Sequence, residues 1–308
     1  MPLDPTARVL LDQLAASGVP SLEVLPVAQA RAVFEALSRN HGAKLALARV
    51  EDRQIPGPAG EIAVRIYTPE AQGPLPVLAY LHGGGWVIGS LETHDALCRE
   101  LARAVQAIVV AVDYRLAPEH PFPAGLEDGY AALAWIAANA DSFGGDPAKL
   151  AIGGDSAGGN LSAVIALLAR DRGGPKIAHQ LLIYPVTDLN ADTVSLRENA
   201  EGYFLTRAIM AWFSTHYITA EQRTLPHASP RLATDHRNLP PATVITAEFD
   251  PLRDDGEAYA VRLREHGIPV ESVRYDGMIH GFITMPMFRQ AGEAIALAAA
   301  GLRRSFDL

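Results

Sequence analysis

Short apolar segments alternate with amphipathic segments along most of this chain, and this alternation constrains the fold more than any other feature. The short segments are nearly continuous in apolar residues, as in "LPVLAYLH" (75–82) and "AIVVAVDY" (107–114), which is typical of strands buried on both faces of a sheet. Similar segments lie at 149–155, 179–186, 242–250 and 270–276. Apolar residues at helical spacing lie at 125–143, 160–173, 254–267 and 291–304. This order predicts an α/β fold with a mostly parallel sheet and helices on both faces.

Two regions do not follow this rhythm. Residues 1 to about 50 have apolar residues at helical spacing and end before a break at "IPGPAG" (55–60). Residues 188–230 contain no clear strand and are rich in aromatic residues. We therefore expect residues 51–187 and 231–308 to form the core of one unit, with residues 1–50 and 188–230 forming a helical cap over the strand ends.

Composition narrows the class of protein. Of the 308 residues, 49% are hydrophobic and 20% charged, and the formal net charge is −9, which is typical of a soluble globular protein. The chain has no long basic run, so we expect no nucleic-acid partner. The first residues lack the basic region of a secretory signal, and no apolar run is long enough to cross a bilayer. We therefore expect a cytoplasmic protein without stable membrane insertion.

The chain has one cysteine, Cys98, so an intramolecular disulfide is excluded. Cys98 lies in "THDALCRELARA", which has helical spacing. We expect a buried structural thiol rather than a catalytic one, because nothing near it in the sequence would activate a thiol.

A serine surrounded by glycines lies between an expected strand and an expected helix. Residues 154–158 read Gly-Asp-Ser-Ala-Gly and fit the pattern G-x-S-x-G. In that pattern the serine occupies a strained turn, and glycines on both sides remove steric clashes. The turn favours Ser156 as a nucleophile, and the alternative interpretation is a glycine-rich turn in which Ser156 only caps the helix.

A nucleophilic serine needs a base and an acid, which follow it along the chain in this kind of fold. Of the 10 histidines, His280 follows a late strand and precedes a glycine. Asp250 lies where the preceding strand ends, and we assign it as the acid. The alternatives are Asp254 and Asp255, which are expected to begin the next helix, and Asp276, which is expected in a solvated turn.

The segment "YLHGGGWVIG" (80–89) follows an early strand and carries three consecutive glycines after His82. Their amides can approach a substrate oxygen, as in the HGGG type of oxyanion loop. We expect His82 to brace the loop without transferring a proton. A rival interpretation is a dinucleotide-binding fingerprint formed by Gly83, Gly85 and Gly89 with Asp113, but it leaves Ser156 unexplained.

Taken together, these motifs resemble the hormone-sensitive-lipase-like branch of the α/β-hydrolase carboxylesterases, also called bacterial family IV. The matching segments are "HGGGW" (82–86), "DYRLAPEHPFPA" (113–124), "GDSAGGN" (154–160), "DPLRD" (250–254) and "IHGF" (279–282). The resemblance implies an α/β-hydrolase fold that hydrolyses esters of short to medium acyl chains without a cofactor or metal. It also implies a triad of Ser156, Asp250 and His280. The implied oxyanion hole consists of Gly84, Gly85 and Ala157, with Gly83 shaping the loop.

The cap is expected to supply a substrate pocket. The aromatic and aliphatic candidates are Phe34, Trp86, Tyr184, Phe204, Leu205, Met210, Trp212 and Phe213. We expect only two or three of them to touch substrate, with Phe204 and Leu205 favoured because they lie within the insertion. The expected partner is a small-molecule ester, and a homodimer is left open. The alternatives are an amidase or peptidase with the same triad, and a non-catalytic ligand receptor on this scaffold.

Overall fold

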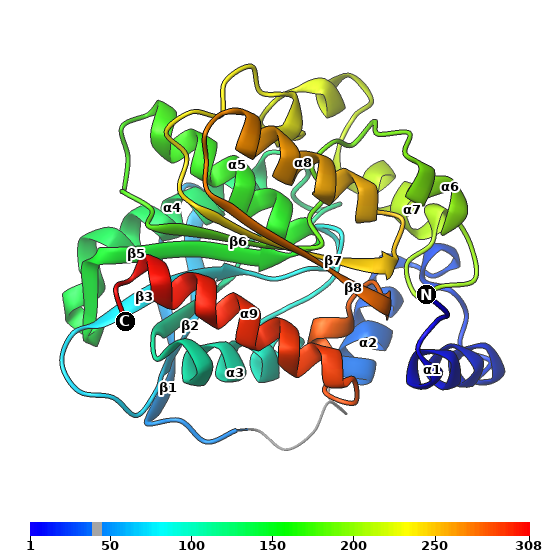
Figure 1. Cartoon of the computed structure of the whole chain (residues 1–308), viewed down its shortest axis with the longest axis horizontal. Helices are drawn as coiled ribbons and strands as arrows, with labels where there is room; N and C mark the ends of the chain where they lie inside the picture. The colour runs from blue at the N-terminus through cyan, green and yellow to red at the C-terminus, as the bar shows by residue number, and fades with distance from the viewer. Residues whose placement is uncertain (39–44) are drawn as a thin grey trace.

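The structure, a computed structural model that describes residues 1–38 and 45–308, contains one large sheet (Figure 1). In the described residues this is an 8-stranded sheet of order β1-β2-β4-β3-β5-β6-β7-β8. The strands are β1 (Arg49–Gly57), β2 (Gly60–Thr68), β3 (Leu75–Leu81), β4 (Ile108–Asp113), β5 (Gly145–Asp155), β6 (His179–Ile183), β7 (Ala242–Phe249) and β8 (Val270–Ile279). Strand β2 is antiparallel to β1 and β4, and the other neighbours are parallel. The predicted mostly parallel sheet is confirmed.

Helices cover both faces of this sheet. The helices are α3 (Asp95–Val105) and α9 (Arg289–Ser305) on one face, and α4 (Ala124–Asn139), α5 (Ala157–Asp171) and α8 (Arg253–Glu265) on the other (Figure 1). Side chains alternate between the faces along each strand. In β3, Leu78 packs in the core beneath α3 and α9, whereas Val77 packs in the core beneath α4 and α5. Two apolar layers therefore hold the strand ends in fixed positions.

The sequence interpretation of the first fifty residues was wrong at its end. Residues 49–57 form the edge strand β1, although we expected helix up to about residue 50 and a break at 55–60. The segment has no alternating apolar pattern, and Ile55 is its only buried residue. Pro56 is tolerated because an edge strand has a neighbouring strand on one side only, so the N–H that proline lacks is not required for pairing. Residues 39–44 lie outside the described part of the chain.

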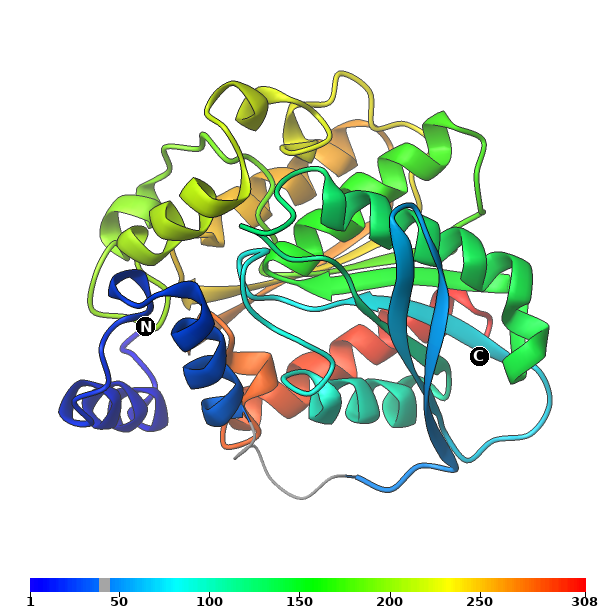
Figure 2. The same ribbon diagram turned by 180° about the vertical axis from the view of Figure 1, so that it is seen from behind.

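The remaining helices gather at the carboxyl end of the parallel strands (Figure 2). These are α1 (Pro5–Ala16), α2 (Val27–Ser38), α6 (Val194–Glu198) and α7 (Arg207–Tyr217). The short 3₁₀ turns are η1 (Leu22–Val24), η2 (Ala140–Phe143), η3 (Glu221–Thr224), η4 (Pro230–Leu232) and η5 (Phe282–Thr284). Segments far apart in the sequence thus lie over the same edge of the sheet. As expected, the structure places no strand within residues 188–230, all of which it describes.

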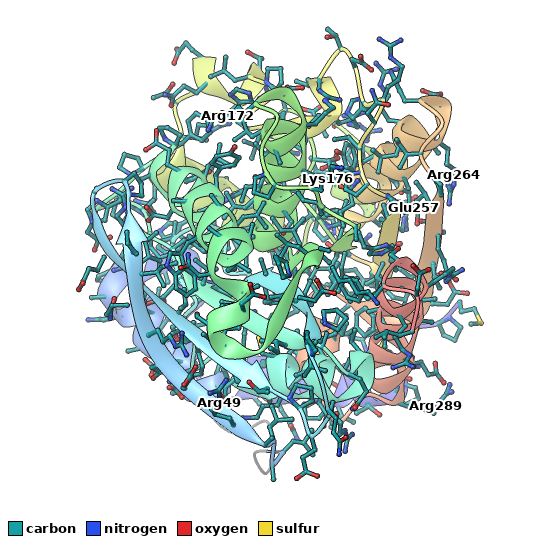
Figure 3. The ribbon with its side chains drawn as sticks, turned by 90° about the vertical axis from the view of Figure 1, so that its left-hand side faces the viewer. Arg49, Arg172, Lys176, Glu257, Arg264 and Arg289 are labelled. Carbon is teal, nitrogen blue, oxygen red and sulfur yellow. The ribbon has the colours of Figure 1, made fainter. Side chains whose placement is uncertain are left out.

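Charged side chains such as Arg49, Arg172 and Arg264 lie at the periphery, away from the two apolar layers (Figure 3). Among the described residues, no helix combines the length and apolar character needed to traverse a bilayer. Cys98 is a buried free thiol in α3, as predicted, and burial raises its pKa well above the ordinary value.

His179 joins three elements at the start of β6. Its Nδ1 lies 2.9 Å from Ser305 Oγ of α9, and its Nε2 lies 3.0 Å from Thr243 Oγ1 of β7. Burial, with a smaller contribution from Arg304, lowers the His179 pKa from 6.5 to about 4. The unfolded chain therefore binds this proton more readily than the folded chain, so the stability that neutral His179 contributes is lost as pH falls from about 6.5 towards 4.

We expect the free energy of unfolding to fall by about 2 kcal/mol between pH 7 and pH 5 because of His179 alone. Urea denaturation at the two pH values measures this change. The His179→Gln protein should lose that part of the pH dependence, although it is less stable at pH 7. An equal pH-dependent loss in the variant and the unaltered protein would contradict the assignment.

Candidate active site

Ser156 occupies the turn between β5 and α5 in a strained backbone conformation. Its φ is 54° and its ψ is −117°, a region that non-glycine residues rarely adopt. A Cβ on Gly154 or Gly158 would overlap the carbonyl oxygen of Leu81, so only glycine fits at either position. The amide of Ser156 donates to Ile183 O at 2.8 Å, which ties the turn to β6. The turn thus presents the Ser156 hydroxyl above the carboxyl edge of the sheet.

His280 and Asp250 lie beside this hydroxyl. His280 Nε2 is 3.0 Å from Ser156 Oγ, and His280 Nδ1 is 2.7 Å from Asp250 Oδ2. Asp250 is fully buried, and its other carboxylate oxygen accepts from the amide of Leu252 at 2.9 Å. The three residues come from the ends of β5, β7 and β8, so the parallel sheet brings them together.

The rival acids are occupied elsewhere. Asp254 accepts from the amide of Ser195 at 2.7 Å, and Asp255 accepts from the hydroxyl of Thr187 at 2.6 Å. Burial raises the pKa of Asp255 to about 6, against the opposing effect of its hydrogen bonds to Thr187. Asp276 is exposed. Among these four acids, and within the described residues, Asp250 is the one that contacts His280.

The glycine loop after β3 lies next to Ser156. Gly84 and Gly85 have φ angles of 120° and 58°, and a Cβ on Gly85 would overlap the ring of Phe213. Within the described residues, neither amide donates to a protein acceptor. The amide of Ala157 begins α5 and has no partner within the helix. These three amides are therefore free to bind a substrate oxygen.

Gly83 differs from the other predicted oxyanion residues. Its amide donates to Asp155 Oδ1 at 3.0 Å and is not free for a substrate. A Cβ here would overlap the same carboxylate. Gly83 therefore shapes the loop, as expected. The prediction that its amide can also bind a substrate oxygen is wrong.

A buried polar cluster beneath the loop was not predicted. Asp155 also accepts from Tyr80 Oη at 2.8 Å and lies 3.2 Å from His94 Nε2. Burial raises the pKa of Asp155, but His94 and the hydrogen bonds from His94 and Tyr80 outweigh burial and lower it. Burial, with His94, lowers the pKa of His82 to about 4, which keeps that imidazole neutral. The one available signal was the acid directly before Ser156, since Tyr80 and His94 lie far away in sequence.

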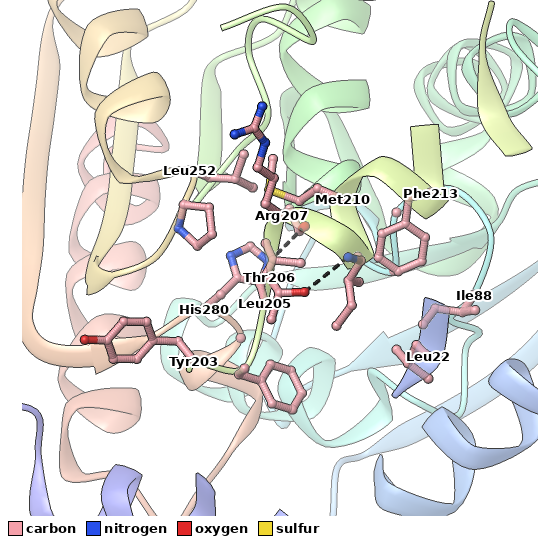
Figure 4. A pocket seen from close by; sticks show the side chains of 18 of the residues that line it. Leu22, Ile88, Tyr203, Leu205, Thr206, Arg207, Met210, Phe213, Leu252 and His280 are labelled. Atoms are coloured by element: carbon pink, nitrogen blue, oxygen red, sulfur yellow. Dashed lines mark hydrogen bonds between the residues drawn. The ribbon is translucent and has the colours of Figure 1, made fainter. Parts of the chain in front are cut away.

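A cavity of about 1200 Å³ opens above Ser156 and His280. In Figure 4 the labelled side chains Leu205, Met210 and Phe213 of the insertion surround it together with Leu22 and Ile88. The predicted residues that line it are Phe34, Trp86, Phe204, Leu205, Met210 and Phe213. Residues not predicted include Leu10, Leu14, Leu22, Ile88 and Leu196. The apolar stripes of the N-terminal segment were the signal that could have identified several of them.

Two predicted pocket residues do not line the cavity. Tyr184 is fully buried, with its ring centroid 4.5 Å from that of His280, and it supports the imidazole from behind. Trp212 packs on His216 along its own helix, at a centroid distance of 4.7 Å. Trp86 does line the cavity, but its ring also stacks on Tyr217 at 4.3 Å. Helical spacing alone does not tell which side of a helix faces the cavity.

Across residues 1–38 and 45–308, no cluster of three histidine, cysteine or acidic side chains is arranged to hold a metal ion. The site itself offers a hydroxyl, an imidazole, a carboxylate and free N–H donors. Such a set can transfer an acyl group and stabilise an oxyanion.

A serine turn above the carboxyl edge of a mostly parallel sheet defines the α/β-hydrolase class. A family model described as "alpha/beta hydrolase fold" matches residues 78–284, and the chain belongs to this family. The carboxylic ester hydrolase LipN of Mycobacterium tuberculosis is 45% identical over 296 residues, which are 92% of this chain and 77% of LipN. Carboxylesterase NlhH of the same species is 46% identical over 83% of each chain.

A solved structure of an ester hydrolase from the metagenome of Lake Arreo has a TM-score of 0.96 and 47% identity, and covers 99% of this chain and 100% of that one. These similarities confirm the predicted resemblance to the hormone-sensitive-lipase-like branch. The dinucleotide-binding interpretation of the glycine loop is therefore wrong.

Proposed function

We propose that this chain is a serine carboxylesterase that hydrolyses short- to medium-chain esters through an acyl-enzyme on Ser156. Membership of the family and relatives named carboxylic ester hydrolase and carboxylesterase support the class of enzyme. The observation that carries the mechanism is the hydrogen-bonded series from Ser156 through His280 to Asp250, at the floor of the cavity.

In the first step, Ser156 Oγ attacks the ester carbonyl carbon while His280 Nε2 takes the hydroxyl proton. The carbonyl oxygen gains the negative charge and binds the amides of Gly84, Gly85 and Ala157. Asp250 stabilises the imidazolium. The tetrahedral intermediate collapses, the C–O bond to the alcohol breaks, and His280 gives its proton to the leaving oxygen. Water then attacks the acyl-enzyme by the same route and releases the acid.

We also propose that residues 1–38 and 188–230 form a cap over a core of residues 49–187 and 231–308, with the boundary that we expected at residue 50 moved so that β1 belongs to the core. The support is that the N-terminal segment and the insertion both line the cavity above Ser156. Arg31 of α2 strengthens this contact, because it donates to the carbonyl of Val87 at 2.8 Å and pairs with Glu119 at 2.7 Å. The cap excludes water and makes the walls apolar, which favours binding of the acyl chain.

The size of the cavity leads to a prediction about chain length. Ligand pockets commonly measure about 300–1,000 Å³, so a cavity of about 1200 Å³ accommodates a whole short or medium ester. With p-nitrophenyl esters, we expect kcat/KM to rise up to a chain between butanoate and octanoate and to gain nothing further up to palmitate, because added methylenes then stay in water. A series that still rises at palmitate would contradict this range.

The amidase alternative is tested in the same assay. A matched p-nitroanilide carries the same acyl chain as the preferred ester and differs in the leaving atom. We expect no measurable turnover of the anilide under conditions in which the ester is hydrolysed. Comparable rates on both substrates would favour an amidase or peptidase.

A further inference from the structure

We propose that Ser195 and Asn199, two buried residues of the insertion, position the triad acid Asp250. This inference rests on the proposed function, because it assigns a task to residues that support its triad. The segment concerned is the acid loop, which we define as residues 248–255, between the end of β7 and the first turn of α8.

Ser195 of α6 binds the acid loop through both its backbone and its side chain. Its amide donates to Asp254 Oδ2 at 2.7 Å, and its hydroxyl donates to the carbonyl of Pro251 at 2.9 Å. The amide of Asp254 donates back to Ser195 Oγ at 3.1 Å. Ser195 is fully buried, so water cannot replace these bonds without an opening of the structure.

Asn199, directly after α6, binds the loop on the other side of Asp250. Its side-chain amide donates to the carbonyl of Asp250 at 3.2 Å and lies 3.4 Å from the carbonyl of Glu248. Its backbone amide donates to Ser195 O at 2.9 Å, which joins the two residues into one unit. Asn199 is only 4% exposed. The insertion therefore holds the backbone immediately before, at and after the acid.

This arrangement controls where the carboxylate points. Asp250 Oδ1 accepts a hydrogen bond from the amide of Leu252 in its own loop, and Oδ2 contacts His280 Nδ1. The orientation of the carboxylate therefore follows the backbone of the loop. Thr193 and Leu196 line the cavity on either side of Ser195. A cap that is not seated on the core would thus leave the acid free to turn away from His280.

The groups that pack against His280 show what a loosened Asp250 would change. Asp250 faces its Nδ1, and the Tyr184 ring packs against it with a phenol whose pKa is raised well above the ordinary value by burial. Arg253 and Asp254, on the acid loop, pair with each other at 2.8 Å. Loosening Asp250 therefore weakens the contact that orients the His280 imidazole and stabilises its charge while Ser156 reacts.

The test compares Ser195→Ala and Asn199→Ala with the unaltered protein, using a soluble p-nitrophenyl ester and enzyme concentrations titrated with a fluorophosphonate. We expect kcat to fall about tenfold in each variant with little change in KM, as expected when one hydrogen bond is lost mainly in the transition state. Damage to the fold alone would instead lower the number of active sites that the fluorophosphonate titrates, without lowering kcat per site. Using two variants keeps the test decisive if one of them does not fold.

The matched control is Ser229→Ala. Ser229 is also a fully buried serine, and in the described part of the chain its hydroxyl bonds only within the insertion, to Arg223 O at 2.6 Å and from Leu189 N at 2.9 Å. Its kcat should stay close to that of the unaltered protein. An unchanged kcat in the Ser195 and Asn199 variants would overturn this inference alone. Failure of the fluorophosphonate to label Ser156 in the unaltered protein would overturn the proposed triad, and this inference with it.

Discussion

Replacing Ser156 with alanine is expected to lower kcat by roughly 10⁶-fold, as removal of the nucleophile does in a serine hydrolase. The reason is that, in the described part of the chain, no other hydroxyl of the cavity is hydrogen-bonded to His280. The remaining rate would come from water oriented by the free amides of Gly84 and Gly85. Initial rates on the preferred ester, with stopped assays over many hours for the variant, measure this ratio.

Ser162→Ala is the control for this substitution. Ser162 lies in α5, the helix that follows Ser156, and is fully buried. Its hydroxyl bonds, within the described residues, only to the carbonyl of Gly158, at 2.8 Å. We expect its kcat to change by less than about tenfold, because loss of a serine back-bond within a helix is a small perturbation. Comparable activity of the Ser156→Ala and unaltered proteins would contradict nucleophilic catalysis by Ser156.

Replacing Asp250 with asparagine is expected to lower kcat by about 10⁴-fold, because an amide favours the wrong tautomer of the histidine it contacts. The contact that the substitution alters is that of Asp250 Oδ2 with His280 Nδ1, at 2.7 Å. Asparagine keeps the size of the side chain, so the fold should survive. Thermal unfolding of both proteins verifies that the loss lies in the chemistry.

Asp276→Asn and Asp254→Asn are the controls for the acid. Asp276 is exposed, and its replacement should leave kcat nearly unchanged. Asp254 holds Ser195, so its replacement should cost far less than that of Asp250. A mild loss at Asp250 together with a severe loss at Asp254 would move the acid to the other position.

Local patterns in the sequence predict the centre of this site. Ser156 and its glycines lie within five residues, and the order of serine, acid and histidine along the chain follows from a parallel sheet whose strand ends meet at one edge. The burial of the central strands β3, β4 and β6 was equally visible, because strands covered on both faces are apolar almost throughout.

Contacts between distant segments could not be predicted in this way. Asp155 meets Tyr80 and His94 only after β3 and β5 pair. Strand β1 was missed because its exposed face and its edge position leave no apolar pattern. Tyr184 and Trp212 were misassigned because the pattern of a segment does not show which neighbour its side chains will face. Ser195 and Asn199 had no sequence signal, because small polar residues also occur on exposed surfaces.

The most direct test of the central claim is to map the covalent adduct that a fluorophosphonate forms with the unaltered protein, by intact mass and peptide sequencing. A hydroxyl activated by His280 should be phosphonylated once per chain, on Ser156, with parallel loss of esterase activity. Labelling of a different residue would contradict the account. A protein that remains unlabelled at a saturating concentration of the reagent would also contradict it, and would make the non-catalytic receptor the better interpretation.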